Sequence, residues 1–561
     1  MSRSNAAAAL LFRRKGDGST LNLDFTTMSA LDSRLTFSRT SNATYINSSG
    51  YVAYADSNMA INTAWLDTNT TPTGWTVYNG AGTPAVLTIP SSGRRSITVT
   101  SGVQSFLYQA ITIPAGFTHT ASIIVHSVTG TGPQLGTFFA INSGTISTFY
   151  KDGSSTGITS STIVTAGTYA ITFTGGDQIR LLGASGTAAS TFTIEISSLQ
   201  IQIGTTISPA FIPNTSTSAA YYAPRFDYDP TTLASKGLLI EGAATNLLNF
   251  SESFATTGGT NNNWANTNLT RTSTNNTSPR NDDTALRLTA SAANGTIISS
   301  AAIGTSAART LSVWLRRVTG TGNIQYTLDN GSTYTTQAIT AVWVRYTFAT
   351  TTAAQRVGFR VVTSADAIEI WGVQLEDGTA ASSYIPTVAS QLTRSADLAL
   401  MTSTNFSSWY TGGTTGTFFV DWHGGVRGIT STVRTVISTS DQTTKHLHLQ
   451  QVSAAGALKV ADFGAAHSVS TANTITSGAQ TKGAFNFVGS TSTVNLCLNG
   501  GTVATSTAIA FSVAPTWLVL GGTSTTGTTL TDLTTVLNGS IRQIKYYPTA
   551  LTSAQLIAMT T

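Results

Sequence analysis

The sequence has very little of the residues that crosslink or anchor a protein. Cys497 is the single cysteine among 561 residues, which excludes an internal disulfide framework. It stands in the alternating stretch TVNLCLNG, a pattern typical of a small residue in a strand core. No apolar run approaches the ~18 residues that a membrane-spanning helix needs, so we expect no membrane insertion. Stability is therefore expected to come from packing and from association of copies.

Charge is also scarce. Charged residues make up 9% of the chain, against about 25% in a typical soluble domain. Hydrophobic residues still make up 40%, enough to bury cores, so the chain does not have the composition of a disordered protein. The net charge of +5 is spread without a run of five like charges, so we expect no nucleic-acid partner. A hydroxyl-rich, weakly charged chain suits an extracellular or virion β protein, and equally any β-rich protein with a neutral surface.

The first residues, MSRSNAAAALLFRRKGDGS, loosely imitate a signal peptide. The apolar part covers residues 6–12 alone, and a basic triplet follows where a small-residue cleavage site would stand. We therefore interpret residues 1–18 as a docking arm that places apolar and basic side chains on a partner. The residues expected to dock are Leu10, Leu11, Phe12, Arg13 and Arg14.

Three sequence blocks occur twice in the same order. TASIIVHSVTGTG at 120–132 matches TLSVWLRRVTGTG at 310–322 without a gap, and TAGTYAITF is paired with TAVWVRYTF. FTIEISSLQIQIG and AIEIWGVQLEDG form the third pair, and Phe-Ile-Pro or Tyr-Ile-Pro follows each. An Asn/Thr-rich stretch with a Trp precedes each set. The repeats predict two copies of one β module, roughly 62–215 and 246–390, that superpose on each other.

Within these blocks the apolar residues alternate with other types. Leu311, Val313 and Leu315 fall on one strand face, and the residues between them fall on the other. This period of two is typical of strands that rest one face on a core, and several such strands between Gly/Ser/Asn turns predict a sandwich.

A third set of short strand patterns runs from about 395 to the end of the chain. In the final stretch LTSAQLIAMT, Thr552 or Ser553 is expected to cap a short helix. Leu556 and Met559 are expected to pack back onto the strands.

Four stretches at the joints between modules resemble a known family. LDSRLTFSRTSNATYINSSGYV at 31–52 resembles the R-x-T-F-x-R-x-S-x-A-T-Y opening of many tailed-phage virion proteins, and PRFDYDPTTLASKGLLIEGAATNLL resembles its usual continuation. WGVQLEDGTAASSYIPTVASQLTRSAD resembles the segment that closes the carbohydrate-binding-like jelly roll of that family. LNGSIRQIKYYPTALTSAQL resembles the last strand and helix of concanavalin/laminin-G-like sandwiches. The resemblance implies an all-β fold: two repeated jelly-roll sandwiches plus a C-terminal concanavalin/laminin-G-like sandwich.

The chain departs from the family in one respect. The opening usually leads within a few residues to the continuation, whereas roughly 170 residues lie between Val52 and Pro224 here. We interpret the interval as the first module copy, inserted into a connector, because the termini of a sandwich are often close. Residues 18–58 and 221–245 are then expected to form one discontinuous element. The expected parts are the arm 1–18, a connector 19–61, a first module 62–220, a connector 221–245, a second module 246–394 and a C-terminal sandwich 395–561.

The sequence offers few groups for catalysis. Asp227 and Asp229 could chelate a cation, but Asp before Pro favours a turn, and two carboxylates alone make a poor calcium site. His446 and His448 share a strand face, yet no carboxylate or cysteine partner stands nearby. No nucleophile elbow, P-loop, H-E-x-x-H or EF-hand pattern occurs. We therefore predict no metal site, no cofactor and no enzymatic activity, although the carboxylate pairs of polysaccharide depolymerases are distant in sequence.

Sugar binding needs aromatic platforms and planar polar groups on an exposed face or loop. Trp314 with Arg316, and Trp343 with Arg345, lie opposite the aliphatic faces of their strands and are the predicted ligand contacts. The alternative is that both tryptophans fill a second layer or a subunit interface.

The two copies are not expected to bind equally, because the first has Ile124 and His126 where the second has Trp314 and Arg316. The predicted function is a tail-fibre or adhesin-like protein of the virion surface that attaches to host surface glycans. It is expected to form a homo-oligomer, with a trimer favoured, and to contact other virion proteins through its arm. A head-fibre or capsid-decoration role is the first alternative, and a polysaccharide-degrading tailspike is the second.

Overall fold

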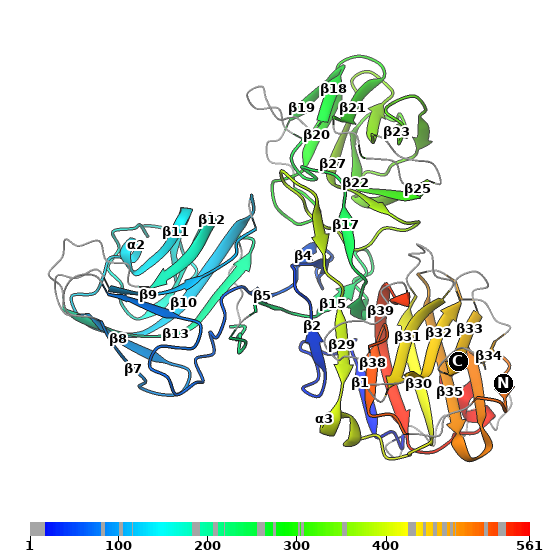
Figure 1. Cartoon of the computed structure of the whole chain (residues 1–561). Helices are drawn as coiled ribbons and strands as arrows, with labels where there is room; N and C mark the ends of the chain where they lie inside the picture. The colour runs from blue at the N-terminus through cyan, green and yellow to red at the C-terminus, as the bar shows by residue number, and fades with distance from the viewer. Residues whose placement is uncertain are drawn as a thin grey trace. The chain divides into compact units, whose positions relative to one another are not determined.

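The computed structural model places most of the chain in short antiparallel strands, which confirms the expected all-β class (Figure 1). It divides into two compact units, one of residues 1–39, 43–53 and 224–561, the other of residues 40–42 and 54–223. Each unit is described by itself. The docking residues Leu10 to Arg14 lie outside the described residues. The structure describes residues 17–561 apart from 80–84, 100–104, 115, 182–190, 206–210, 218, 255–263, 273–276, 301–302, 304–307, 351–355, 425–432, 441–444, 453–456, 463–467, 472–474, 477, 510–513 and 525–534.

The first module is built on one large sheet that bends along its longest strand. β12 passes through Gly175 and Gly176, which both have positive φ, so its two halves pair with different neighbours. The strands in spatial order are β6 (Thr76–Asn79), β9 (Ser105–Ala110), β12 (Gly167–Leu181), β10 (Thr118–Gly130), β13 (Phe192–Ile203), β8 (Arg95–Val99) and β7 (Val86–Thr88). β11 (Phe139–Lys151) also pairs with β12, and the one-turn helix α2 (Leu135–Phe138) precedes it. β5 (Ser57–Asn58) pairs with β14 (Tyr221–Tyr222), so both ends of the module meet.

The second module has two five-stranded sheets around one core. The strands of one sheet are β18 (Trp264–Thr267), β21 (Gly295–Ser299), β26 (Gly358–Val361), β23 (Ile324–Thr327) and β24 (Thr335–Gln337). The strands of the other are β19 (Leu269–Thr272), β20 (Leu286–Ala290), β27 (Ala367–Asp377), β22 (Arg309–Thr319) and β25 (Val344–Thr350). β17 (Ala244–Asn246) and β28 (Leu392–Arg394) pair where the chain enters and leaves.

The two modules share one strand order. The order β12-β10-β13-β8-β7 of the first module matches β25-β22-β27-β20-β19 of the second, with the recurring blocks on equivalent strands. Likewise β6-β9 matches β18-β21, and the second half of β12 takes the place of β26. A common order of strands is what a duplicated module requires.

A shared irregularity supports the same origin. The pairing of β10 with β13 skips after Ser122, and that of β22 with β27 skips after Ser312, which are equivalent positions of the aligned blocks. In both skips the bulged strand has a left-handed residue, Ser198 with φ 61° and Gly372 with φ 63°. β-bulges of this kind tend to persist within families because they re-aim side chains.

The repeated Gln and Ile-Pro positions close each module. In the second module Asn246 Nδ2 donates to the backbone carbonyls of Val373 (3.2 Å) and Ile385 (2.9 Å). Gln374 Oε1 accepts from the backbone N–H of Ile385 at 2.6 Å. Ile385, in the segment after β27, is thus hydrogen-bonded both to Asn246 of β17 and to Gln374 of β27.

The first module repeats this fastening with equivalent residues. Asn58 Nδ2 donates to the carbonyls of Leu199 (3.0 Å) and Ile212 (2.9 Å), and Gln200 Oε1 accepts from the N–H of Ile212 at 2.9 Å. The motif I-E-I, Gln and Ile-Pro therefore occurs twice because each copy needs this closure for its buried backbone groups.

The C-terminal sandwich encloses one core between two sheets. The strands of the first sheet are β15 (Arg225–Tyr228), β16 (Ser235–Ile240), β39 (Gly539–Tyr547), β30 (Thr415–His423), β35 (Gln480–Val488), β36 (Thr493–Leu498) and β37 (Ala504–Ser506), and β1 (Leu21–Asp24) also pairs with β39. The strands of the second are β2 (Thr36–Ser38), β29 (Leu398–Met401), β38 (Trp517–Leu520), β31 (Val433–Ser440), β32 (Lys445–Val452), β33 (Ala457–Asp462) and β34 (Ser468–Ser470).

This membership corrects the expected connectors. The two parts of the element expected from residues 18–58 and 221–245 do pair with each other at β5 and β14, but their strands β1, β2, β15 and β16 belong to the C-terminal sandwich. They supply apolar side chains to its core, including the buried Leu23 and Ile240, and such short strands cannot bury these alone. The sandwich expected at 395–561 therefore includes two further parts of the chain. The next strands, β3 (Thr44–Ile46) and β4 (Val52–Tyr54), form a small hairpin.

The end of the chain folds as the sequence predicts. Helix α4 (Ser553–Thr560) begins at the N-cap Thr552, whose hydroxyl accepts from the backbone of Gln555 in a capping box. Leu556 is buried, Met559 packs beside it, and Cys497 lies fully buried in the same cluster. The other short helices are α3 (Ser403–Ser407) and the 3-10 turn η1 (Gly489–Thr491). Among the described residues, no helix combines the length and the apolar character that crossing a membrane demands.

Candidate functional site

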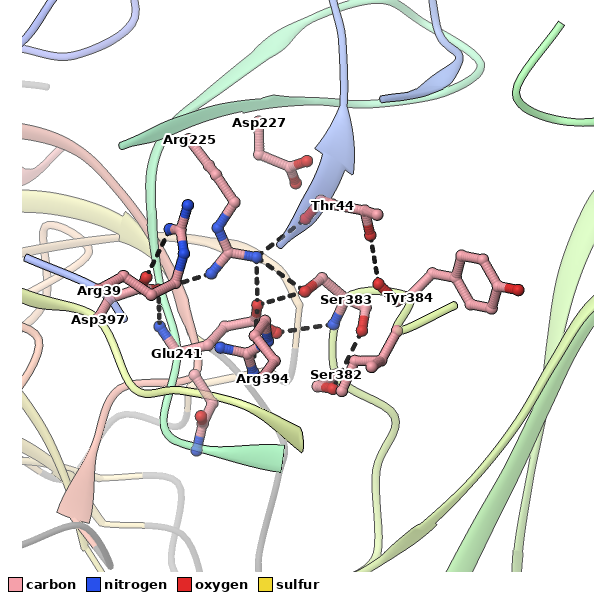
Figure 2. Close-up of polar contacts among 12 residues, drawn as sticks. Arg39, Thr44, Arg225, Asp227, Glu241, Ser382, Ser383, Tyr384, Arg394 and Asp397 are labelled. Carbon is pink, nitrogen blue, oxygen red and sulfur yellow. Dashed lines mark hydrogen bonds and ion pairs between the residues drawn. The ribbon is translucent and has the colours of Figure 1, made fainter. Parts of the chain in front are cut away.

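A buried arginine organises the joint between the second module and the C-terminal sandwich. Arg225 on β15 is fully buried. Its Nη1 donates to Glu241 Oε2 (2.7 Å), to Ser383 Oγ (2.8 Å) and to the carbonyl of Thr44 (2.9 Å). Its Nη2 donates to Asp397 Oδ2 at 2.6 Å (Figure 2). One side chain thus connects Thr44, near the start of the chain, with Glu241 and with the segment that holds Ser383 and Asp397.

Two more arginines complete the buried charge network, which we define as Arg39, Arg225, Glu241, Arg394 and Asp397. Arg39 Nη1 donates to Asp397 Oδ1 at 2.9 Å, and a nitrogen of Arg394 lies 3.5 Å from Glu241 Oε2 (Figure 2). All five side chains are almost completely buried. Charges at this depth are tolerated because each one faces an opposite charge and is hydrogen-bonded.

The protonation states follow from these contacts. Burial alone would raise the pKa of Asp397, but the guanidinium groups of Arg225, Arg39 and Arg394 hold it below its ordinary value. Burial likewise opposes ionisation of Glu241, and Arg394 and Arg225 lower its pKa well below the usual range. Burial lowers the pKa of Arg39 to about 10, which leaves it charged at neutral pH.

The network explains the motifs that resemble the phage family. Arg39 belongs to the opening motif, Arg225 and Glu241 to its continuation, and Arg394 and Asp397 to the segment that closes the jelly roll. The sequence analysis did not identify this cluster. Charged residues are rare in this chain, and their presence inside the otherwise apolar motifs could have indicated a buried network. Its ion pairs join segments of the second module and of the C-terminal sandwich.

A pocket of about 190 Å³ lies beside the network. Its volume exceeds the ~150 Å³ of an engineered cavity that holds benzene, so it admits one ring-sized group. The lining comes from the β3–β4 hairpin, from β15 and β16, and from the second module. The lining residues are Thr44, Tyr45, Ile46, Val52, Asp227, Leu239, Glu241, Trp314, Arg345, Ala381, Ser382, Ser383 and Tyr384.

Aromatic rings form one wall of the pocket. Trp314 packs edge-on against Trp371 (5.2 Å between centroids) and Tyr384 (5.4 Å), and Trp371 lies 4.8 Å from Tyr384. The guanidinium carbon of Arg345 lies 4.5 Å from the Trp314 ring centroid, a cation–π contact. Trp314 lines the pocket but is 7% exposed, so only a small part of its ring is open to a ligand.

Polar groups also line the pocket. Arg345 donates to the Ser382 carbonyl (2.8 Å) and to Ser312 Oγ (2.9 Å), which fixes the guanidinium. Asp227 Oδ1 accepts from the N–H of Ile46 at 2.8 Å, and the described residues offer this carboxyl no second hydrogen bond. Burial raises the pKa of Asp227 to about 6. Figure 2 shows Asp227 beside the strand that carries Thr44.

The four predicted ligand contacts form two arginine–tryptophan pairs, and each pair joins two neighbouring strands. Trp314 and Arg345 face each other in register across β22 and β25, so Arg345 stacks on Trp314. Arg316 stacks on Trp343 at 4.9 Å and pairs with Glu369. The first two residues line the pocket, whereas Arg316 and Trp343 lie outside it and stay partly exposed.

For Trp314 the structure shows the alternative that the sequence left open, a place in a second layer. This face of the sheet is covered by Val52 of the hairpin and by Tyr384, which bury Trp314 together with Trp371. An alternating strand pattern marks which residues leave the core, but it does not reveal a second layer built from distant segments.

Asp229, the second carboxylate of the candidate pair, lies in a turn. Asp229 Oδ1 accepts from the N–H groups of Thr231 (3.0 Å) and Thr232 (2.9 Å), which is a turn and not a cation site. The His446 side chain lies outside the described part of the chain. Within that part, no group of three or more His, Cys, Asp or Glu could hold a metal ion.

Comparisons with known proteins yield distant structural likenesses. No family model and no curated protein matches the chain. Among solved structures, the CBM40 of the Ruminococcus gnavus IT-sialidase bound to alpha2,3 sialyllactose is 20% identical, with 26% of this chain and 83% of that chain covered and a TM-score of 0.22. The CBM22 tandem domain of Paenibacillus barcinonensis Xyn10C is 11% identical, with 58% and 99% covered and a TM-score of 0.22. A SAP-like pentraxin from Limulus polyphemus is 12% identical, with 27% and 70% covered and a TM-score of 0.23. TM-scores this low carry no argument about function.

Proposed function

We propose that the chain is a tail-fibre or adhesin-like protein of a tailed-phage virion surface, and that it attaches to a host glycan through the pocket beside Trp314. The observation that carries the glycan part is the convergence of an aromatic wall, a fixed guanidinium and a carboxyl on one ring-sized pocket. The virion part is supported by the resemblance of the joint motifs to phage virion proteins. The charged residues of those motifs meet in one buried network, as a shared joint requires.

The pocket suits one pyranose unit. The C–H groups of a sugar ring pack on the edges of Trp314 and Tyr384, because ligand sites are mostly apolar surface with a few placed polar groups. A sugar hydroxyl donates to the carboxyl of Asp227, which has spare acceptor capacity. Arg345 cannot rotate away, since Ser382 and Ser312 hold it, so the site needs little ordering when a ligand binds.

A blocking substitution tests this proposal. Ala381 lines the pocket and is half-buried, so Ala381→Phe fills the space without touching the charge network. Ala380→Phe, on the preceding residue outside the lining, is the matched control. Binding of the full chain to a bacterial glycan array is expected to fall about tenfold or more with Ala381→Phe and to stay unchanged with the control. Equal binding by both variants, or no array ligand for the original chain, would contradict the glycan site.

Electron microscopy tests the virion part separately. Gold-labelled antibodies against the chain are expected to mark tail fibres of phage particles. Label on the head would favour the head-fibre alternative, and unlabelled particles would contradict a virion role altogether.

A further inference from the structure

The first module carries an aromatic cluster on a sheet face that points away from its core. Tyr78 of β6 and Phe106 of β9 are paired in register, and Tyr108 of β9 is paired with Arg180 of β12. Leu107, the residue between the two β9 aromatics, belongs to the core instead. The alternation of the strand therefore places Tyr78, Phe106, Tyr108 and Arg180 together on the outer face, which we call the outer platform.

The rings of the outer platform are stacked on one another. Tyr78 and Phe106 have centroids 4.7 Å apart and an interplanar angle of 20°, and Phe106 lies 5.6 Å from Tyr108. The guanidinium carbon of Arg180 lies 4.8 Å from the Phe106 centroid. Phe106 is 6% exposed because its neighbours cover it, whereas Tyr78 is 44% exposed and offers its ring to solvent.

Arg180 is held in place and makes no direct ion pair with a described residue, although the pKa of the neighbouring Asp177 is lowered by its hydrogen bond from Asn142 and also by the charge of Arg180. Its Nε donates to Gln178 Oε1 at 2.7 Å, which helps to hold the guanidinium over Phe106. The nearby Asp177 carboxylate is occupied by Asn142 Nδ2 (2.8 Å) and Ser143 Oγ (3.2 Å). Within the described part of the chain nothing hydrogen-bonds the two terminal nitrogens of Arg180, so these nitrogens can meet an acceptor from outside.

The second module shows that the fold does not need these side chains. Trp75 directly precedes β6 and Trp264 is the first residue of the equivalent β18, and the core residues Leu107 and Ile297 occupy equivalent places on the neighbouring strands. With that alignment, the residues of the second module at the positions of Tyr78, Phe106, Tyr108 and Arg180 are Thr267, Thr296, Ile298 and Gly358. Two copies of one architecture thus differ at this face, and an exposed aromatic group that folding does not require marks an interaction surface.

We propose that the outer platform binds an acidic polysaccharide, that is, a glycan chain with carboxylate groups. The exposed Tyr78 ring accepts the C–H face of a sugar residue, as aromatic surface next to planar polar groups does. Arg180 forms a two-pronged contact with the sugar carboxylate, for which a planar guanidinium is the best matched side chain. The occupant is anionic because Arg180 is the one charged side chain that the described parts of β6, β9 and residues 178–181 place on this face. This site lies in the first module and does not depend on the pocket in the second.

Affinity gel electrophoresis of the full chain tests the outer platform. The gels contain alginate, polygalacturonate or hyaluronate as acidic probes, and hydroxyethyl cellulose as the neutral probe. At least one acidic probe is expected to retard the original chain. Tyr78→Ala and Arg180→Gln are each expected to weaken that binding about tenfold. Tyr150→Ala, which removes a half-buried tyrosine elsewhere in the same module, is expected to leave it unchanged.

The outcomes separate this site from the pocket and from a subunit contact. Ala381→Phe is expected to bind the acidic probe normally, so loss of binding there would assign the ligand to the pocket and overturn the inference. Retardation by hydroxyethyl cellulose alone, or by no probe, would overturn it too. Light scattering completes the test: if Tyr78→Ala lowers the mass of an oligomer, the platform is a subunit interface instead of a glycan site.

Discussion

At the scale of single residues, the charge network sets the strongest expectations. Arg39 and Arg225 both donate to Asp397, and all three side chains are buried. Replacing Asp397 by Asn keeps the shape of the side chain but leaves two buried guanidinium groups without this partner. We expect Asp397→Asn to lower the free energy of unfolding by about 3–5 kcal/mol, measured by urea denaturation.

Asp32 offers the matched control for that substitution. Its ion pair with Arg34 is partly exposed to solvent, and such pairs contribute about 0–1 kcal/mol. Asp32→Asn should therefore have a small effect. If the two variants unfold at the same urea concentration, the network does not hold the joint.

Asp227 makes stability depend on pH in the opposite sense to its neighbours. Burial raises its pKa from 3.8 to about 6, so the folded chain binds this proton more tightly than the unfolded chain does. Its contribution to stability is therefore present at low pH and is lost as the pH rises from about 4 to about 6. For Glu241 and Asp397 the pKa is lowered, and their contribution is lost as the solution becomes acidic.

The variant Asp227→Asn isolates this effect, because the amide oxygen can still accept from the N–H of Ile46. The difference in unfolding free energy between variant and original chain should shift in favour of the variant between pH 4 and pH 7. Denaturation curves at the two pH values measure it. A difference that does not change with pH would show that Asp227 has an ordinary pKa.

The sequence could indicate residue types for the site but not their surroundings. Alternation correctly placed Trp314 and Arg345 off the core face, and both line the pocket. It could not reveal that Val52, more than 250 residues earlier, covers Trp314. It also paired arginines with tryptophans along each strand, whereas stacking occurs across neighbouring strands.

At the scale of elements, the β-bulge that both modules share can be tested by adding a side chain at Gly372 and by removing one at Ser198. Gly372 has φ 63°, and a Cβ there would lie 2.9 Å from the Trp314 ring. Gly372→Ala is therefore expected to lower stability by about 2 kcal/mol, from backbone strain and from displacement of the ring. Scanning calorimetry of the full chain measures the change.

The equivalent Ser198 has nearly the same φ of 61° but carries a side chain. Relief of left-handed strain makes Ser198→Gly neutral or stabilising by up to about 1 kcal/mol. The two substitutions are expected to change stability in opposite directions because both positions share the same left-handed backbone conformation. Destabilisation by Ser198→Gly as large as that of Gly372→Ala would argue against an equivalent bulge.

Strands that belong to a repeated block could be predicted from the sequence. The strands that the connectors add to the C-terminal sandwich could not. The recurring blocks marked β10, β12 and β13 and their counterparts, because each copy serves as a template for the other. The strands β1 and β39 pair Leu21 with Tyr546. Four-residue strands carry too few residues for a period, and nothing in the sequence states a partner over 500 residues away, so the connectors were not recognised as sandwich strands.

At the scale of the whole molecule, association of copies is expected from the composition. Few charges have to be desolvated when two such surfaces meet, which favours interfaces between copies. We expect light scattering at micromolar concentration to give a mass about three times that of the 58.4 kDa chain. A mass of one chain under these conditions would contradict the trimer.

The docking arm gives the last prediction. Asp17, the first described residue, already belongs to the C-terminal sandwich, because its carboxylate accepts from Lys545 Nζ (2.7 Å) and from the Tyr547 hydroxyl (3.2 Å). A deletion of residues 2–16 stops before these contacts and removes no strand. The truncated chain should unfold at the same temperature as the full chain but fail to enter phage particles, because the segment 6–12 and the basic triplet would no longer reach their partner. Asp17→Asn, which weakens the sandwich contact but keeps the arm, should be incorporated normally. Incorporation of the truncated chain at the level of the full chain would refute the arm and place the docking surface within the folded part of the molecule.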